Sequence, residues 1–77
     1  MRVSHVYDSS YLFHYILDLF YNFNIVNVQL ISQEFEYDKS SIYKIIKKID
    51  YNQELINSKF RVIKVKPLCY KFEINEL

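Results

Sequence analysis

The chain has 77 residues, 51% of them hydrophobic and 18% aromatic, which is enough apolar surface for one small domain spanning residues 1–77. The absence of glycine excludes a glycine-rich phosphate-binding loop, and the single Cys69 excludes an internal disulfide, as expected in the reducing cytoplasm. No apolar run is long enough for a membrane span and no signal-peptide core is found near the N-terminus, so a soluble protein is expected.

The net charge of +1 is unevenly distributed along the chain. Residues 1–38 hold one arginine against five acidic residues, a net charge of −4. Residues 39–77 hold nine basic residues against four acidic ones, a net charge of +5. Such polarity is typical of a domain that presents one end to phosphate, although a solvated lysine-rich surface would have the same composition.

The first helix is expected at residues 11–22. Residues 1–7 can form a short strand or an arm, and Asp8, Ser9 and Ser10 offer capping side chains before the helix. Its apolar residues fall on two sides, a core-facing side of Leu12, Ile16, Leu19, Phe20 and Phe23 and a second side of Phe13, Leu17 and Tyr21. A helix that is apolar over so wide an arc is either central to the core or shared with a partner, and we expect the second side to form a homodimer interface.

A β-branched step at residues 25–28 can add a stub of strand before the second helix. That helix is expected at residues 28–36, with Ile31 and Phe35 buried. Ser32 supplies the small side chain that lets a neighbouring helix approach closely.

The third helix, expected at residues 39–49, has the strongest periodic signal in the chain. Its apolar residues follow the i, i+3, i+4, i+7 pattern of one helix face: Ile42, Ile45, Ile46 and Ile49. Asp38 precedes it, and its carboxylate is expected to cap the helix at the backbone N–H of Ser40 or Ser41.

Two alternating segments at residues 59–75 predict a β-hairpin. Its tip is expected at residues 66–68, because Pro67 is excluded from a central strand ladder. Tyr70, Phe72 and Ile74 are expected to face inward, and Lys71 and Glu73 to face water. Cys69 is interpreted as a small strand residue.

The order of helix, helix, turn, helix and hairpin resembles the winged helix-turn-helix superfamily over most of the chain. Residues 30–46 (LISQEFEYDKSSIYKII) are similar to its helix with a small residue, its turn and its Ser/Thr-rich helix start. Leu55-Ile56 resembles the hydrophobic pair that leads into the first wing strand. Glu36 stands where many members carry glycine, and a non-glycine residue at positive φ has a steric cost, so we expect a turn drawn differently or one residue longer. The resemblance implies an α+β fold of three helices and a C-terminal β-hairpin wing.

The face of the third helix opposite the isoleucines and the hairpin tip form the expected DNA site. The candidate DNA-binding residues are Lys39, Ser40, Ser41, Tyr43, Lys44, Lys47 and Lys48 on the helix and Lys64 and Lys66 on the wing. Hydroxyls and free N–H groups at a helix start suit phosphate oxygens, and lysines reach phosphates or guanine edges. The alternatives are a solvated helix face and an edge strand protected from aggregation by lysines.

The expected function is sequence-specific binding of double-stranded DNA by a homodimer, without catalysis. The helix at 39–49 would enter the major groove and the wing at 59–75 would lie on the flanking backbone. Within the superfamily, a chain of this length resembles small dimeric transcriptional repressors and the TubR-like centromere-binding adaptors of tubulin-type plasmid or phage partition systems. The alternative class is a protein-interaction module that grips a filament, or a phage-type inhibitor of a host polymerase or replication component. No metal or cofactor is expected, because His5, His14 and Cys69 lack metal-ligand spacing, and no cluster of acid, base and nucleophile indicates an enzyme.

Overall fold

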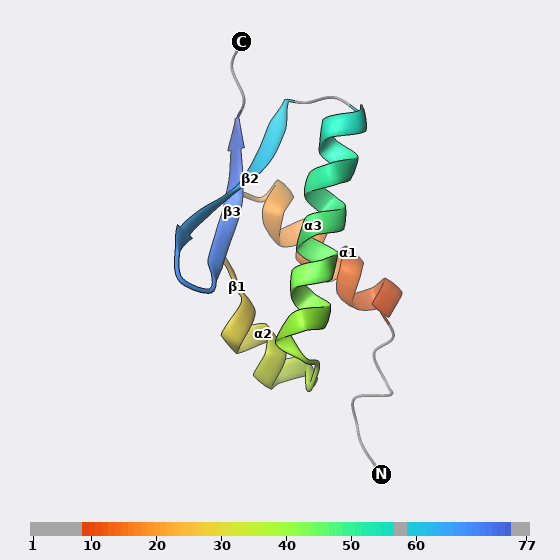
Figure 1. Cartoon of the computed structure of the whole chain (residues 1–77), viewed down its shortest axis with the longest axis vertical. Helices are drawn as coiled ribbons and strands as arrows, with labels where there is room; N and C mark the ends of the chain where they lie inside the picture. The colour runs from red at the N-terminus through yellow and green to blue at the C-terminus, as the bar shows by residue number, and fades with distance from the viewer. Residues whose placement is uncertain (1–8, 57–58, 75–77) are drawn as a thin grey trace.

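Three helices and a three-stranded antiparallel sheet make up the described part of the chain, residues 9–56 and 59–74 of the computed structural model. In chain order the elements are α1 (Ser9–Tyr21), β1 (Val26–Asn27), α2 (Val28–Phe35), α3 (Lys39–Ile56), β2 (Phe60–Lys66) and β3 (Cys69–Ile74). The long α3 packs against α1, α2 and β2, and the β2–β3 hairpin lies beside it (Figure 1). The expected α+β class with three helices and a C-terminal hairpin is confirmed. The capping role of Asp8 and the role of residues 1–7 lie outside the described residues.

The sheet has the strand order β1-β3-β2, so the hairpin contributes the central strand and one edge. The short β1 occupies the other edge, where Val26 pairs with Tyr70 and Asn27 with Cys69. The predicted stub of strand is therefore confirmed. Pro67 and Leu68 form the turn between β2 and β3, as the sequence predicted.

One face of each helix encloses the core together with the sheet. The buried core residues are Leu12, Ile16, Phe20, Val26, Val28, Ile31, Phe35, Ile42, Ile45, Ile46, Ile49 and Phe72. The four predicted isoleucines of α3 are among them, as are Ile31 and Phe35, so these predictions are confirmed. The Phe72 ring stacks on Phe20 at 4.8 Å and on Phe60 at 5.3 Å between centroids, which joins the sheet to α1.

Two residues expected in the core are half exposed. Phe23, 47% exposed, lies beyond the end of α1, because the helix stops at Tyr21 and Phe23 takes a positive φ of 58° that turns its side chain off the helix face. Ile74, 53% exposed, pairs with Phe60 at the open end of the hairpin. Its partner Phe60 is at the edge of the aromatic stack with Phe72, so the alternation of β3 continues further than the core does.

α3 runs beyond its predicted end near residue 49 to Ile56, so Leu55-Ile56 lies in its last turn and does not lead directly into the wing. The reason is Gln53, which is buried at 5% exposure although it is polar. Its amide Nε2 donates a hydrogen bond to the hydroxyl of Tyr21 on α1, at 2.7 Å. A buried amide with a partner extends the packed face of the helix while interrupting the apolar pattern in the sequence.

The helix caps differ from the prediction. Within the described residues, the Asp38 carboxylate makes no capping hydrogen bond. The backbone carbonyl of Asp38 instead accepts from the N–H groups of Ser41 and Ile42 at 3.1 and 3.3 Å. A side-chain cap is found on α2, where Asn27 Oδ1 accepts from the backbone N–H of Leu30 at 3.1 Å.

The turn between α2 and α3 keeps the geometry that a glycine would favour, although the chain has none. Glu36 itself is left-handed, with φ 57° and ψ 41°, so the expectation of a differently drawn turn is wrong. The turn is fixed by Ser32, whose carbonyl accepts from the Tyr37 N–H at 3.2 Å and whose hydroxyl donates to the Tyr37 carbonyl at 2.5 Å.

We therefore expect Glu36→Gly to be more stable than Glu36→Ala by about 1 kcal/mol, because only glycine adopts a left-handed conformation without a Cβ clash. Both variants lack the carboxylate, so their difference isolates the backbone effect. Urea unfolding followed by circular dichroism measures it. Equal midpoints would show that Glu36 is not strained.

Candidate nucleic-acid interface

The outer side of α3 carries an exposed ridge opposite its buried isoleucines. Ser40, Lys44, Lys47 and Tyr51 share this side, since residues three and four apart are neighbours on a helix surface. Tyr51 is 61% exposed. The sequence interpretation missed it, because the helix was expected to end before Tyr51. The sequence feature that could have placed Tyr51 on this side is its i+4 spacing from Lys47.

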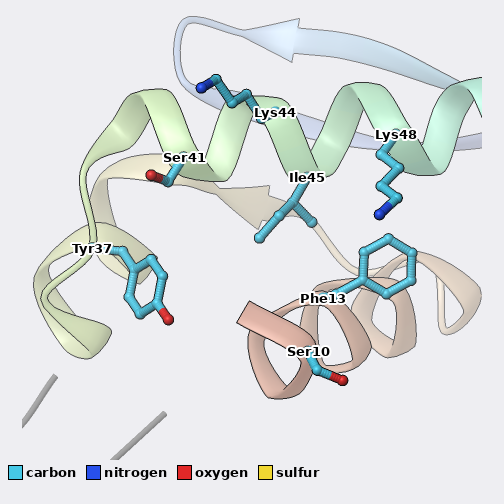
Figure 2. A pocket seen from close by; sticks show the side chains of 7 residues that line it. All are labelled: Ser10, Phe13, Tyr37, Ser41, Lys44, Ile45 and Lys48. Atoms are coloured by element: carbon cyan, nitrogen blue, oxygen red, sulfur yellow. The ribbon is translucent and has the colours of Figure 1, made fainter. Parts of the chain in front are cut away.

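A groove of about 510 Å³ separates the first turns of α3 from α1. Figure 2 shows the residues that line it: Ser10, Phe13, Tyr37, Ser41, Lys44, Ile45 and Lys48. The Lys48 ammonium lies 5.6 Å from the centre of the Phe13 ring, close enough for a cation–π contact, whereas Lys44 points away from Phe13 (Figure 2). Lys48 is thus directed toward this flank and Lys44 is directed outward.

A second groove, of about 460 Å³, lies between α3 and the wing. Its lining residues are Tyr43, Ile46, Lys47, Asp50, Val62, Lys64 and Tyr70. Tyr43 is half-buried here and contacts the Tyr70 ring edge-on, with centroids 6.0 Å apart. Tyr43 therefore lines this groove and does not lie on the outer ridge, where it was expected.

Six exposed lysines lie on α3 and on the wing. Lys39, Lys44, Lys47 and Lys48 of α3 and Lys64 and Lys66 of the wing are all exposed. Within the described residues none of them forms an ion pair, whereas Arg61, on the side of the wing, is bound to Glu73 at 2.8 Å. The positive charge of these lysines is available to a ligand, and Ser40 and Ser41 add hydroxyls at the first turn of α3.

One acidic residue, Asp50, lies within this basic surface. Its carboxylate accepts a hydrogen bond from the backbone N–H of Val62 at 3.1 Å, which ties β2 to α3. It also lines the wing-side groove beside Lys47 and Lys64. The sequence alone did not single out Asp50, because its partner is a backbone group of a distant strand.

Asp50→Asn is expected to raise the affinity for duplex DNA about threefold or more, since it removes a negative charge facing phosphate while its amide oxygen still accepts from Val62. Asp50→Ala is the matched control, because it removes both the charge and the hydrogen-bond acceptor. It should raise the affinity as well, but it should also lower the free energy of unfolding by about 0.5–1.5 kcal/mol. Fluorescence anisotropy and urea unfolding measure the two effects. A lower affinity for Asp50→Asn would place the DNA elsewhere.

The three residues assigned to a dimer interface differ in exposure. Phe13 and Leu17 are half-buried and pack against the core, and Phe13 also lies under Lys48. Tyr21 is 46% exposed, and its ring packs against Phe60 and Phe72 edge-on. The structure therefore places Leu17 and Tyr21 in one depression on α1 and Phe13 in the groove between α1 and α3.

Away from the basic surface, burial raises the pKa of the Tyr15 hydroxyl above its usual 10.0, and the Glu34 carboxylate and Tyr11 raise it further. The folded state thus holds this proton more tightly than the unfolded chain. The resulting stability is fully present below pH 10 and is lost as pH rises through the folded pKa. Tyr15→Phe should remove this part of the loss of stability at high pH. Urea midpoints measured from pH 8 to 11 should therefore fall less steeply with pH for Tyr15→Phe than for the natural chain.

Among the described residues there is no cluster of three or more His, Cys, Asp or Glu side chains fit to hold a metal ion. None of the helices in the described part is both long and apolar enough to cross a bilayer. No protein-family model, curated protein or solved structure matches the chain. No relative therefore supplies a function for this surface.

Proposed function

We propose that the chain is a winged helix-turn-helix protein that binds double-stranded DNA. Support for the fold comes from the element order α1-β1-α2-α3-β2-β3 with strand order β1-β3-β2. In this arrangement α3 is the probe for the major groove and the hairpin is a wing on the flanking backbone.

The observation that carries the proposal is the gathering of six exposed lysines, none ion-paired within the described residues, on α3 and the neighbouring hairpin. Lys44 and Lys47 project from the ridge, where they can reach base edges or phosphates. Lys64 and Lys66 lie at the wing beside its tip, suited to the backbone or the minor groove. Asp50 and the edge contact of Tyr43 with Tyr70 hold the wing against α3, which fixes the spacing between the two sets of lysines.

The protein acts as a homodimer without catalysis, and occupancy of its site represses a promoter or marks DNA for partition. A homodimer doubles the number of lysines that face one duplex and reads a two-fold symmetric site. Sequence specificity would come from the ridge residues, whereas the lysines of the flanks mainly position the protein.

The salt dependence of duplex binding tests the proposal. If a dimer neutralises about six phosphates, the logarithm of the binding constant should fall with the logarithm of salt concentration with a slope of about −5. Fluorescence anisotropy with a labelled duplex gives this slope, and an excess of unlabelled duplex of unrelated sequence separates specific from general binding. A binding constant that does not change with salt concentration, or no binding at low salt, would reject the proposal.

A second candidate function is binding of another protein. It is favoured by two exposed side chains, Tyr51 on the ridge (61% exposed) and Leu30 on α2 (59% exposed). Aromatic side chains are common anchors of protein interfaces. Under this function Tyr51→Ala would abolish binding of the partner, while reversal of the ridge charges would leave that binding intact.

A further inference from the structure

The outer side of α1 forms a face of its own, separate from the basic surface. A shallow depression of about 410 Å³ is lined there by Tyr11, His14, Tyr15, Leu17, Asp18 and Tyr21, which we call the α1 face. Tyr11 and Tyr21 are 50% and 46% exposed. α1 packs into the core through Leu12, Ile16 and Phe20, and Tyr15 and Leu17 on its flanks are half-buried. His14 and Asp18, in the middle of the face, are exposed on the side of α1 opposite the core.

The α1 face is complementary to itself. When two copies of a helix pair antiparallel about a two-fold axis, residues equally distant from the axis on either side face one another. With the axis at the level of Ile16, His14 lies opposite Asp18 of the second copy and Tyr11 lies toward Tyr21, whereas Tyr15 and Leu17 lie on the two flanks of the helix pair. Four of the six residues that line the depression thereby receive a partner from the same set.

The chemistry of each pair is favourable. The imidazole of His14 carries an N–H donor in either protonation state, and the carboxylate of Asp18 is an acceptor. Neither side chain forms an ion pair within the described residues, although Asp18 is occupied through its backbone carbonyl, which accepts from Asn22. Two symmetric His–Asp contacts flanked by tyrosines give a polar centre with aromatic ends.

We propose that two copies of this chain associate through the α1 face, antiparallel, with reciprocal contacts between His14 and Asp18. The inference deepens the homodimer of the proposed function by placing its interface, and it does not depend on DNA binding. The depression on α1 shares no lining residue with the two grooves beside α3, so both copies can keep their basic surfaces open. One helix pair is a small interface, so the dimer is expected to dissociate in the micromolar range, on the order of 10 μM.

The test exchanges the two charged partners one at a time and then together. His14→Asp places carboxylates opposite carboxylates, and Asp18→His places imidazoles opposite imidazoles, so each single variant should dissociate at a concentration about tenfold or more higher than the natural chain. The double variant His14→Asp with Asp18→His restores the pairing with the partners reversed and should dimerise within about threefold of the natural chain. Light scattering after size exclusion separates the 9.5 kDa monomer from a dimer over a range of loading concentrations.

A mixture of the two single variants gives the sharpest result. The copy with two carboxylates and the copy with two imidazoles complement each other at both contacts, so the mixture should form a heterodimer where each variant alone is monomeric. This rescue also excludes misfolding as the cause of the single-variant defects. A natural chain that stays monomeric at 1 mM, single variants that dimerise normally, or a mixture without rescue would overturn the inference.

The same samples separate this inference from the proposed function. Natural chain that binds duplex DNA but stays monomeric would reject the α1 interface alone. Natural chain that dimerises through the α1 face but binds no DNA would reject the DNA-binding function alone.

Discussion

Replacing Lys44 and Lys47 together with glutamate is expected to weaken binding to duplex DNA about a hundredfold or more at about 0.1 M salt. Both lysines are exposed on the ridge of α3, and within the described residues neither is bound by an acidic side chain. The change removes two attractive interactions with phosphate in each copy and adds two repulsive charges. The salt slope should also become shallower, by about 0.9 for each phosphate that the variant no longer neutralises. Fluorescence anisotropy at several salt concentrations measures both quantities.

Lys59→Glu is the matched control for this prediction. Lys59 is exposed like the ridge lysines but precedes β2, at the end of the wing opposite its tip. It should reduce affinity only slightly, through the change in net charge. All these positions are on the surface, so stability should change by no more than about 0.5 kcal/mol for each substitution. Equal losses from Lys59→Glu and from the ridge variant would mean that binding depends on net charge and not on this surface.

Phe72→Ala is expected to lower the free energy of unfolding by about 3–5 kcal/mol, the largest stability effect we foresee. Phe72 is 1% exposed and stacks on Phe20 and Phe60, and the Tyr21 ring meets it edge-on at 5.3 Å. Its truncation removes the ring stacking that joins the central strand to α1. A domain this small has only about 5–15 kcal/mol of stability, so the melting temperature should fall by about 15 °C or more.

Ile74→Ala controls for the loss of a large side chain in the same strand. Ile74 lies two residues further along β3 and is 53% exposed, so its truncation should reduce stability by less than about 1 kcal/mol. Urea unfolding of both variants, followed by circular dichroism, makes the comparison. Similar losses for the two would contradict the placement of the core around Phe72.

Much of the fold could be predicted from periodicity. The i, i+3, i+4, i+7 isoleucines of α3 reported its buried face correctly, and the alternation around Pro67 reported the hairpin. The ends of elements could not be predicted in this way. Gln53 is polar in sequence and buried in the structure, because a hydroxyl from α1 satisfies its amide. Phe23 and Ile74 follow apolar patterns that continue past the point where neighbouring elements cover them.

The candidate site, like the fold, could be predicted from the sequence only in part. Helical spacing was enough to predict that Lys44 and Lys47 lie on the outer side of α3, because that depends only on which face is buried. The two grooves, the contact of Lys48 with Phe13 and the hydrogen bond from Val62 to Asp50 depend on how distant segments meet. Such contacts leave no local pattern in a single sequence.

An NMR titration of ¹⁵N-labelled protein with its duplex DNA tests the DNA-binding surface most directly. The expected result is that the largest amide shifts fall within residues 39–48 of α3 and residues 64–68 at the wing tip. The amides of His14 and Asp18, which line neither groove beside α3, should move little. Shifts confined to α1, or no shifts at saturating duplex and low salt, would contradict the assignment of α3 and the wing to DNA.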